Sequence, residues 1–225
     1  MKKFIKNLRI VKNIRNYFRT KNILSTSGGQ IKLSTPPGKL IYEFIKNNEI
    51  NNVLEIGTWN GLGSTLVIHD ALSTKNKTFT LTSLETDKIA FKNAKKNLKD
   101  KVGINLKLGR IVEIDELPNP DSIDFRKYNL NPENIEWFHQ DIRRYKKTRN
   151  ILEDLDNNYD FILFDGGEFS TFAEFKKLYK KTSYFCLDDL NAYKQYEVLE
   201  YIKNFPDKFE LIDVVEDLGI YKVIK

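Results

Sequence analysis

From Val53 to Gly63 the chain reads Val-Leu-Glu-Ile-Gly-Thr-Trp-Asn-Gly-Leu-Gly. The first four residues form a short, mostly apolar run that is typical of a buried strand. Glycines follow at the spacing GxxxGxG, and residues 64–72 have the apolar character of a helix. Glycine at 57 allows the backbone to turn sharply, and glycine at 61 allows a ligand to lie against the main chain. The segment therefore predicts a strand, a ligand-binding turn and a helix.

The alternation of strand and helix continues along the chain after this segment. The expected strands are residues 53–56, 79–84, 104–108, 159–164, 183–187, 209–215 and 221–224. The expected helices are residues 40–47, 64–72, 87–98, 172–181 and 193–204. Such alternation predicts an α/β fold, a doubly wound, mostly parallel seven-stranded sheet with helices on both faces. No helix separates the last two strands, so we expect a hairpin that makes one C-terminal strand antiparallel.

Residues 110–150 do not fit this alternation and are predicted to be an insertion in a domain that spans residues 25–225. The insertion contains a loop at 116–121 and a short helix at 135–145 that is rich in aromatic and polar groups. An insertion of this size in a compact domain is usually a lid or a binding loop. We therefore expect it to shape a substrate pocket.

The N-terminal residues 1–24 are predicted to form a basic amphipathic helix, followed by a linker at 25–38 that is rich in glycine, proline and serine. Residues 1–22 hold eight basic groups and no acid, and their apolar residues follow helical spacing. We favour a helix that packs on the domain with its lysines in solvent. The alternatives are peripheral contact with a membrane or another anionic partner, and a cap over the substrate cleft.

Composition narrows the class of protein. The longest run without charge, residues 56–69, has 14 residues, whereas a membrane-spanning helix needs about 20. The single cysteine, Cys186, excludes an internal disulfide and a cysteine-based zinc cluster, and favours a cytoplasmic setting. Lysines number 29 and arginines 8, and base readout favours arginine. Specific recognition of nucleic acid is therefore not expected.

The end of the second expected strand adds a nucleoside signal. Glu85 lies 22 residues beyond Gly63, and an acid at that distance can accept hydrogen bonds from ribose hydroxyls. The dinucleotide spacing GxGxxG and a phosphate-loop lysine are both absent from the sequence. The pattern therefore favours a nucleoside without phosphates.

With these motifs, residues 30–225 resemble a class I S-adenosylmethionine-dependent methyltransferase. The resemblance implies that S-adenosylmethionine is the cofactor and that Glu85 binds its ribose. It also implies an adenine contact near Gly109 and Arg110. The residues expected to hold the rest of the cofactor are Glu55, Gly57, Thr58, Asn60, Gly61 and Gly63.

Carboxylates gather at the ends of the fourth and fifth expected strands. Asp165 and Glu168 follow the fourth strand, and Asp188 and Asp189 follow the fifth. Both strand ends open onto the crevice of the glycine turn, where clustered carboxylates repel one another unless a cation joins them. Oxygen ligands suit Mg²⁺ or a similar divalent cation, which would lower the pKa of an acceptor hydroxyl. The alternative is that Asp189 caps the next helix and Glu168 is solvated.

This second motif resembles metal-dependent O-methyltransferases of the catechol and caffeoyl-CoA type and of the macrocin and sugar type. The resemblance implies that Asp165, Asp188 and Asp189 are metal ligands. Two positions depart from it, because Gly167 replaces a second acid of the sugar enzymes and residues 181–183 replace a Pro-Gly-Gly turn. The run DGGEFSTFAEF is similar to methyltransferase-like proteins of surface-glycan synthesis.

The leading hypothesis is an S-adenosylmethionine-dependent O-methyltransferase that acts on a hydroxyl of a sugar, a glycan or another small polar acceptor. Asp165, Glu168 and His139 are the candidate catalytic residues, the last two as proton acceptors. The alternatives are a non-catalytic methyltransferase-like module that docks through its basic N-terminal helix, metal-free transfer to nitrogen or carboxylate, and aminopropyl transfer.

Overall fold

The computed structural model describes residues 30–119, 123, 124, 128, 130 and 132–224. The basic helix expected at 1–24 therefore lies outside the described residues. Among the residues that are described, none of the helices combines the length and the apolar character needed to cross a bilayer.

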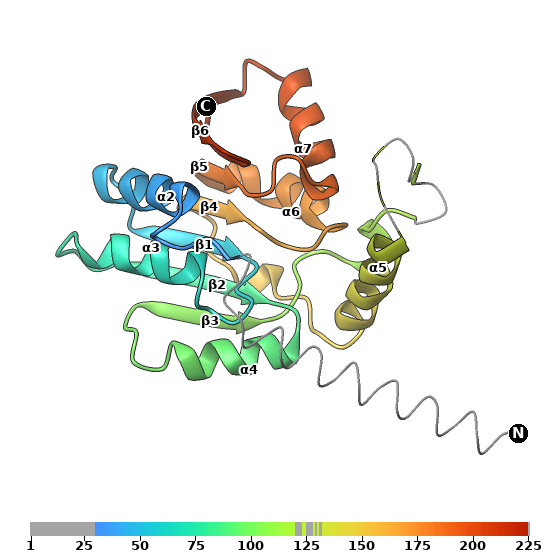
Figure 1. Cartoon of the computed structure of the whole chain (residues 1–225), viewed down its shortest axis with the longest axis horizontal. Helices are drawn as coiled ribbons and strands as arrows, with labels where there is room; N and C mark the ends of the chain where they lie inside the picture. The colour runs from blue at the N-terminus through green and yellow to red at the C-terminus, as the bar shows by residue number, and fades with distance from the viewer. Residues whose placement is uncertain (1–29, 120–122, 125–127, 129, 131, 225) are drawn as a thin grey trace, which may run out of the picture.

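The described chain alternates strands with helices (Figure 1). The strands are β1 (Asn52–Ile56), β2 (Thr80–Glu85), β3 (Ile104–Leu108), β4 (Tyr159–Phe164), β5 (Thr182–Leu187), β6 (Phe209–Val215) and β7 (Leu218–Val223). The α-helices are α2 (Pro36–Asn47), α3 (Ser64–Ser73), α4 (Lys88–Asn97), α5 (Pro132–Tyr145), α6 (Thr171–Leu178) and α7 (Tyr193–Asn204). Short 3-10 turns are η1 (Ile114–Glu116), η3 (Leu152–Asp154) and η4 (Tyr179–Lys181).

The strands form one seven-stranded sheet in the order β3-β2-β1-β4-β5-β7-β6. Strands β1 to β5 pair in parallel, and β7 is antiparallel to both β5 and β6. This confirms the predicted doubly wound, mostly parallel sheet with one antiparallel C-terminal strand. Ile56, at the end of β1, pairs with Leu84 of β2 and Phe164 of β4, so three strands end side by side. The segments that leave these three strands therefore start from one edge of the sheet.

Apolar side chains alternate between the two faces of the sheet, as the strand period requires. On one face, Val53 and Phe161 pack with the apolar side chains of α2 and α3. On the other face, Leu54 and Ile162 pack with those of α6 and α7. Both faces are therefore covered, which explains why β1 and β4 are each buried over all but one residue.

Helix α2 begins earlier than the sequence predicts. Its first residue is Pro36, and the hydroxyl of Thr35 caps it by accepting a hydrogen bond from the backbone N–H of Gly38 at 3.3 Å. Proline suits the first helical turn because the N–H that it lacks has no partner there. A Cβ at Gly38 would lie 1.8 Å from the carbonyl oxygen of Lys32, so the glycine serves close packing. The predicted linker at 25–38 was wrong at residues 36–38, which begin the helix, and the predicted helix start at residue 40 is therefore too late.

The insertion at 110–150 is closed at its base and packed against the domain. Arg110 and Asn150 form a parallel bridge that joins its two ends. Further out, the rings of Phe138 and Phe169 meet at 5.0 Å between centroids, and those of Tyr128 and Tyr193 at 5.1 Å. The insertion thus rests on the segments that come after β4 and β5. Figure 1 shows its helix α5 standing apart from the helices that flank the sheet.

Candidate functional site

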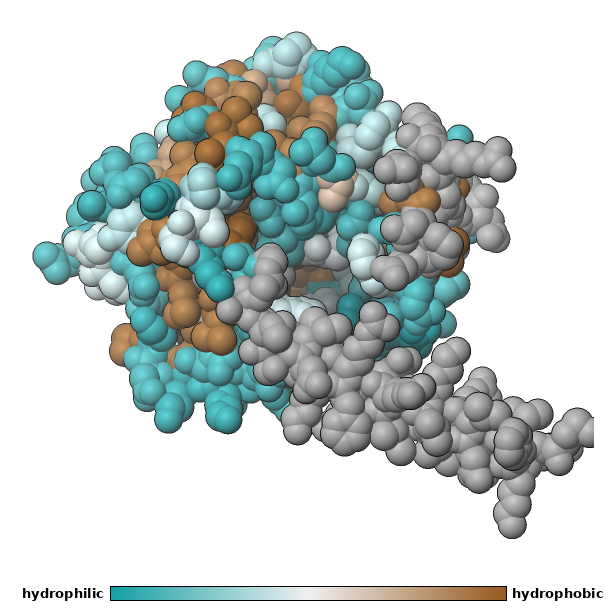
Figure 2. Space-filling view, in the orientation of Figure 1, coloured by the Kyte–Doolittle hydropathy of each residue, from teal (hydrophilic) through white to brown (hydrophobic). Residues whose placement is uncertain are grey.

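A cavity of 370 Å³ lies at the carboxyl ends of β1, β2 and β4, between these ends and α5. Figure 2 shows a hollow in this face of the molecule with mostly hydrophilic residues around it. Open α/β sheets bind ligands at this edge. The predicted site residues that line the cavity are Gly57, Thr58, Gly63, Glu85, Gly109, Arg110 and Asp165. Glu55, Asn60 and Gly61 are not among the residues that line it.

The glycines of the turn are required by close packing and by backbone conformation. Gly57 has a φ of +103°, and a Cβ there would lie 2.0 Å from the carbonyl oxygen of Asp165. Gly61 has a φ of +75°, and a Cβ there would lie 2.6 Å from Cδ1 of Leu98. The turn therefore holds β1 against β4 on one side and against the end of α4 on the other. Only Gly57 of this pair lines the cavity.

Glu55 is fully buried beneath the turn and anchors it. Its carboxylate accepts hydrogen bonds from the hydroxyls of Ser64 at 2.6 Å, Thr65 at 2.7 Å and Ser83 at 2.5 Å. These hydroxyls tie the start of α3 and the middle of β2 to β1. Burial away from water raises the pKa of Glu55 to about 7, although the three hydroxyls oppose this. Its expected contact with the methionine part of a cofactor stays a prediction.

Glu85 is held by the backbone at the end of β2 and faces the cavity. One carboxylate oxygen accepts the N–H of Trp59 at 2.7 Å, and the other accepts those of Thr86 at 2.8 Å and Asp87 at 2.7 Å. A carboxylate has about four acceptor positions, so capacity for about one further donor remains. Burial raises the pKa of Glu85 to about 7. A ribose hydroxyl is a donor of the kind that this position can accept.

Several buried polar atoms at the cavity lack a protein partner. Among the described residues, these include Oε1 of Gln30, Nε and Nη1 of Arg110, and Oε2 of Glu174, and all three residues line the cavity. Buried polar groups are nearly always hydrogen-bonded, so these atoms indicate a ligand that carries both donors and acceptors. Five acidic residues and two arginines line the cavity, which favours a positively charged ligand over a phosphorylated one. A nucleoside with a sulfonium group, such as S-adenosylmethionine, fits these observations.

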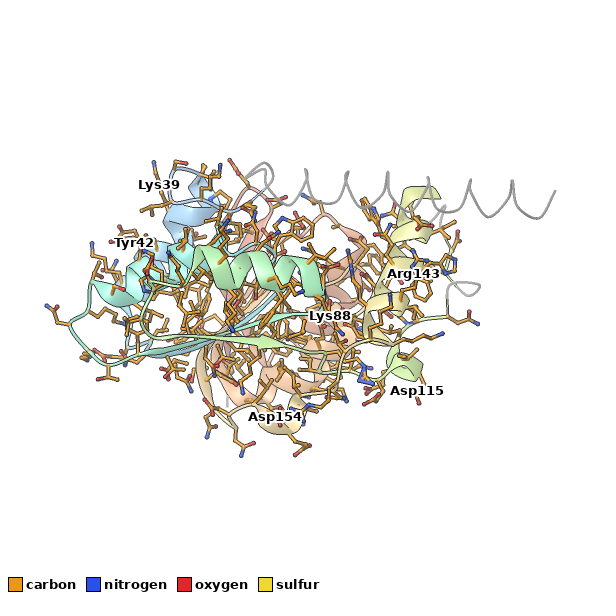
Figure 3. All side chains as sticks on the ribbon, turned by 90° about the horizontal axis from the view of Figure 1, so that it is seen from below. Lys39, Tyr42, Lys88, Asp115, Arg143 and Asp154 are labelled. Atoms are coloured by element: carbon orange, nitrogen blue, oxygen red, sulfur yellow. The ribbon has the colours of Figure 1, made fainter. Side chains whose placement is uncertain are left out.

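Helix α5 supplies a wall of the cavity that the sequence did not predict in detail. Arg144 bonds Asp87 of the α4 cap at 3.1 Å and Asp141 at 3.0 Å, and so ties α5 to the start of α4. Figure 3 shows Lys88 at the end of α4 that is nearer to Arg143 of α5. The spacing of Asp141 and Arg144 on one helix face was visible in the sequence, but their partner on α4 was not.

The acidic residues that come after β4 and β5 meet as predicted. One carboxylate oxygen from each of Asp165, Asp188 and Asp189 lies within 4.8 Å of the others, and we call these three residues the acid cluster. Desolvation, together with the charge of Asp165, raises the pKa of Asp188 to about 8. Asp189 has a φ of +56°, a conformation that few residues other than glycine adopt. The alternative that Asp189 caps the next helix was wrong, because the N-cap of α7 is Ala192 and no side-chain hydrogen bond caps the helix.

Lys194, which no sequence motif singles out, lies within the acid cluster. Its ammonium nitrogen is 2.8 Å from Oδ1 of Asp165 and 2.7 Å from Oδ2 of Asp189. Although burial opposes its charge, these carboxylates raise the pKa of Lys194 above its ordinary value. The oxygen donors alone suit Mg²⁺. In this structure, however, the ammonium of Lys194 lies between Asp165 and Asp189, so the acid cluster as arranged does not fit a divalent ion.

The two expected proton acceptors lie in different surroundings. Glu168 is partly buried, accepts the backbone N–H groups of Tyr193 and Lys194, and has its pKa raised by burial. His139 is exposed on α5, beside the ring of Phe138, and does not line the cavity. The acid cluster is therefore close to Glu168, and the catalytic roles of both residues stay predictions.

Comparison with family models finds no match, and no curated protein matches the sequence. Solved structures do match. An O-methyltransferase from Bacillus cereus in complex with SAH has a TM-score of 0.58 at 14% identity, over 92% of this chain and 89% of that chain. The O-methyltransferase TomG from Streptomyces achromogenes, involved in tomaymycin synthesis and solved with SAM, has a TM-score of 0.55 at 15% identity, over 87% and 82%.

A putative caffeoyl-CoA O-methyltransferase from Staphylococcus aureus has a TM-score of 0.53 at 15% identity, over 98% of both chains. Identities this low show likeness of fold alone. The chain therefore shares the fold of these solved O-methyltransferases, as the resemblance of its sequence implied.

Proposed function

We propose that this protein is an S-adenosylmethionine-dependent O-methyltransferase that methylates a hydroxyl of a sugar, a glycan or another small polar acceptor. The observation that carries the proposal is the cavity, where Glu85 faces inward beside unpartnered polar atoms of Arg110 and Glu174. Solved structures of the same fold, two of them described with SAM or SAH, support the cofactor.

The roles of the cavity residues follow from their chemistry. S-adenosylmethionine, when bound, supplies a methyl group on a positively charged sulfur. Glu85 accepts a hydrogen bond from a ribose hydroxyl, and Arg110 donates to acceptor atoms of the base. The acidic lining offsets the positive charge of the sulfonium group. Arg144 and Tyr145 of α5 exclude water from one side of the cavity.

On the acceptor side, methyl transfer requires that the hydroxyl proton leaves as the new bond forms. Glu168 is our candidate for this proton, because it lies beside the acid cluster and burial raises its pKa above the ordinary value, which makes it a stronger base. His139 is the second candidate. The aromatic residues Phe138 and Tyr128 of the insertion pack on Phe169 and Tyr193, and so hold the insertion beside this part of the site.

The sequence also predicts a divalent cation that is bound by Asp165, Asp188 and Asp189. The convergence of the three carboxylates supports that cation, and Lys194 between two of them opposes it. If Mg²⁺ bound there, it would lower the pKa of the acceptor hydroxyl. The transfer that we propose has no step that depends on this ion.

Calorimetry with S-adenosylhomocysteine tests the proposal directly. We expect the full chain to bind it, and Glu85→Gln to bind it more weakly. Glu43→Gln, which changes an exposed residue of α2, is the matched control and keeps the affinity. Absence of binding at millimolar ligand would instead favour the non-catalytic module, whose basic residues 1–22 would contact a membrane or an anionic partner.

A screen with isotope-labelled S-adenosylmethionine identifies the acceptor class. Hydroxyl compounds, with sugars and glycan fragments first, are compared with amines and carboxylic acids of similar size. Label transferred to hydroxyl compounds is the expected result. Label on amines or carboxylates alone would replace the proposal with N- or carboxyl-methyl transfer.

A further inference from the structure

Lys194 is a buried ammonium at the point where the ends of β4 and β5 meet. The residue is 6% exposed, although lysine is almost never buried without a partner. Its nitrogen bonds Asp165 at 2.8 Å and Asp189 at 2.7 Å. Removing an ammonium from water is unfavourable unless opposite charges compensate for it. The two carboxylates provide that compensation, and the lysine does the same for them.

The start of α7 fixes the position of this ammonium. The side chain of the next residue, Gln195, donates to the carbonyl oxygens of Phe164 at 3.2 Å and Asp188 at 2.8 Å, which end β4 and follow β5. The backbone N–H of Lys194 itself is bound by Glu168. The lysine therefore extends into the acid cluster from a helix end that is tied to both strands.

An ammonium and a divalent ion cannot share this place. Mg²⁺ lies about 2.0–2.1 Å from its oxygen ligands and demands near-octahedral geometry. One carboxylate oxygen of Asp165 and one of Asp189 already bind Nζ of Lys194. A divalent ion would have to displace the lysine from its two partners and leave its charge buried beside the metal.

We propose that Lys194 is the resident cation of the acid cluster, that it occupies the place of a divalent metal, and that methyl transfer by this protein is metal-independent. Metal independence of the transfer rests on the proposed function, whereas the place of Lys194 in the acid cluster does not. An ammonium has three N–H donors, and Asp165 and Asp189 take two. The third is assigned to the acceptor oxygen, which makes Lys194 a specificity-determining residue for a hydroxyl acceptor. The acceptor's proton leaves for Glu168, and the electron pair of the broken sulfur–carbon bond stays on sulfur.

Metal binding by the chelator-treated full chain tests the proposal without any need for activity. Mn²⁺ is titrated into wild type and Lys194→Met, and free Mn²⁺ is measured by electron paramagnetic resonance. We expect no binding by wild type at millimolar Mn²⁺. We expect Lys194→Met to bind Mn²⁺, and the double variant with Asp165→Asn added to lose that binding. Binding by wild type that Asp165→Asn abolishes would overturn the proposal. So would a folded Lys194→Met that binds no Mn²⁺.

Two further variants keep the test decisive. Lys203→Met removes an exposed lysine from the same helix and should leave Mn²⁺ binding as in wild type. If Lys194→Met fails to fold, Lys194→Arg is used, because it keeps the positive charge. It should exclude Mn²⁺ as wild type does. Mn²⁺ binding by a folded Lys194→Arg at the acid cluster would contradict the proposal.

The proposed function has a separate readout in the same samples. Binding of S-adenosylhomocysteine depends on the cavity at β1 and β2, so it should be unchanged by Mn²⁺ or by chelator. With an active acceptor, wild type should keep its turnover in excess chelator. Loss of turnover that only Mg²⁺ or Mn²⁺ restores would overturn metal independence, while the assignment as a methyltransferase would stand.

Discussion

The ends of β1 and β2 and the ends of β4 and β5 both hold carboxylates at one edge of the sheet, but they stabilise them in different ways. On the cofactor side, Glu55 is held by three hydroxyls and Glu85 by three backbone N–H groups. On the acceptor side, Asp165 and Asp189 are bridged by the ammonium of Lys194.

The difference arises from how closely the acids are spaced. A single buried carboxylate can be held by neutral donors, although desolvation then raises its pKa, as at Glu55 and Glu85. Three carboxyl groups with oxygens within 4.8 Å also repel one another when ionised, which raises the pKa of Asp188 to about 8 and favours an ammonium between Asp165 and Asp189. The two sides should therefore respond differently to substitution and to pH.

The largest effect on the cofactor side is expected from Gly57→Ala. The new Cβ would lie 2.0 Å from the backbone oxygen of Asp165, and the φ of +103° is strained for alanine. Backbone cannot move aside as a flexible side chain does, so we expect a loss of about 3 kcal/mol or more in the free energy of unfolding. Binding of S-adenosylhomocysteine should be lost as well, measured by calorimetry.

Gly103→Ala is the matched control for this substitution. Gly103 also has a positive φ, of +86°, but the nearest atom to a new Cβ belongs to the ring of Phe79, away from the cavity. This variant should lose stability and keep its affinity for S-adenosylhomocysteine. Equal affinity in both folded variants would show that the turn at Gly57 does not position the cofactor.

On the acceptor side, Glu168→Gln should reduce turnover by about 100-fold or more, because a positioned proton acceptor contributes at least that much. Affinity for S-adenosylhomocysteine should not change, since Glu168 does not line the cavity. Turnover is measured with labelled cofactor and the acceptor identified in the screen. Glu200→Gln, an exposed acid of α7, is the control, and equal turnover in both variants would transfer the role to His139.

The sequence predicted the fold well because periodicity is a local property. The bounds of β3, β4, β6 and α7 agree with the residues expected, since each is a continuous apolar or amphipathic run. The acid cluster was predicted for a similar reason, because parallel strands bring their carboxyl ends together.

The features that the sequence did not predict depend on contacts between distant segments. Lys194 is an ordinary lysine in a helix pattern until α7 is placed at the ends of β4 and β5. Glu55 was expected to line the cavity, yet Ser83, 28 residues away, is one of the donors that hold it beneath the turn. Spacing along the chain cannot show which side chains meet across the sheet.

The pH dependence of the free energy of unfolding tests the raised pKa of Glu55, whose carboxylate has only neutral hydrogen-bond donors. Burial raises the pKa of Glu55 to about 7, from 4.5 in an unfolded chain. Between these two pH values the native state binds a proton that the unfolded state has lost. The stabilisation of the native state by this proton is fully present below pH 4.5 and disappears as the pH rises through about 7. It amounts to about 3 kcal/mol.

Urea unfolding of wild type and Glu55→Gln between pH 5 and pH 8 measures this contribution. The free energy of unfolding should fall with rising pH in wild type, and should fall less in Glu55→Gln, which cannot ionise. Glu200→Gln, where the acid is exposed, should follow wild type. Parallel pH curves for Glu55→Gln and wild type would contradict the raised pKa.

The smallest effect concerns Tyr145→Phe in the wall of the cavity. The hydroxyl of Tyr145 donates to Oε1 of Glu174 at 3.1 Å and so orients a carboxyl group whose Oε2 has no partner. Its removal should lower stability by about 1 kcal/mol, the net value of such a hydrogen bond. Affinity for S-adenosylhomocysteine should fall about fivefold, because the same free energy positions Glu174 for a ligand. Tyr179→Phe, which removes a bond to the hydroxyl of Tyr201 away from the cavity, should lower stability alone. If both variants keep full affinity, Glu174 contributes to the fold of the wall and not to ligand binding.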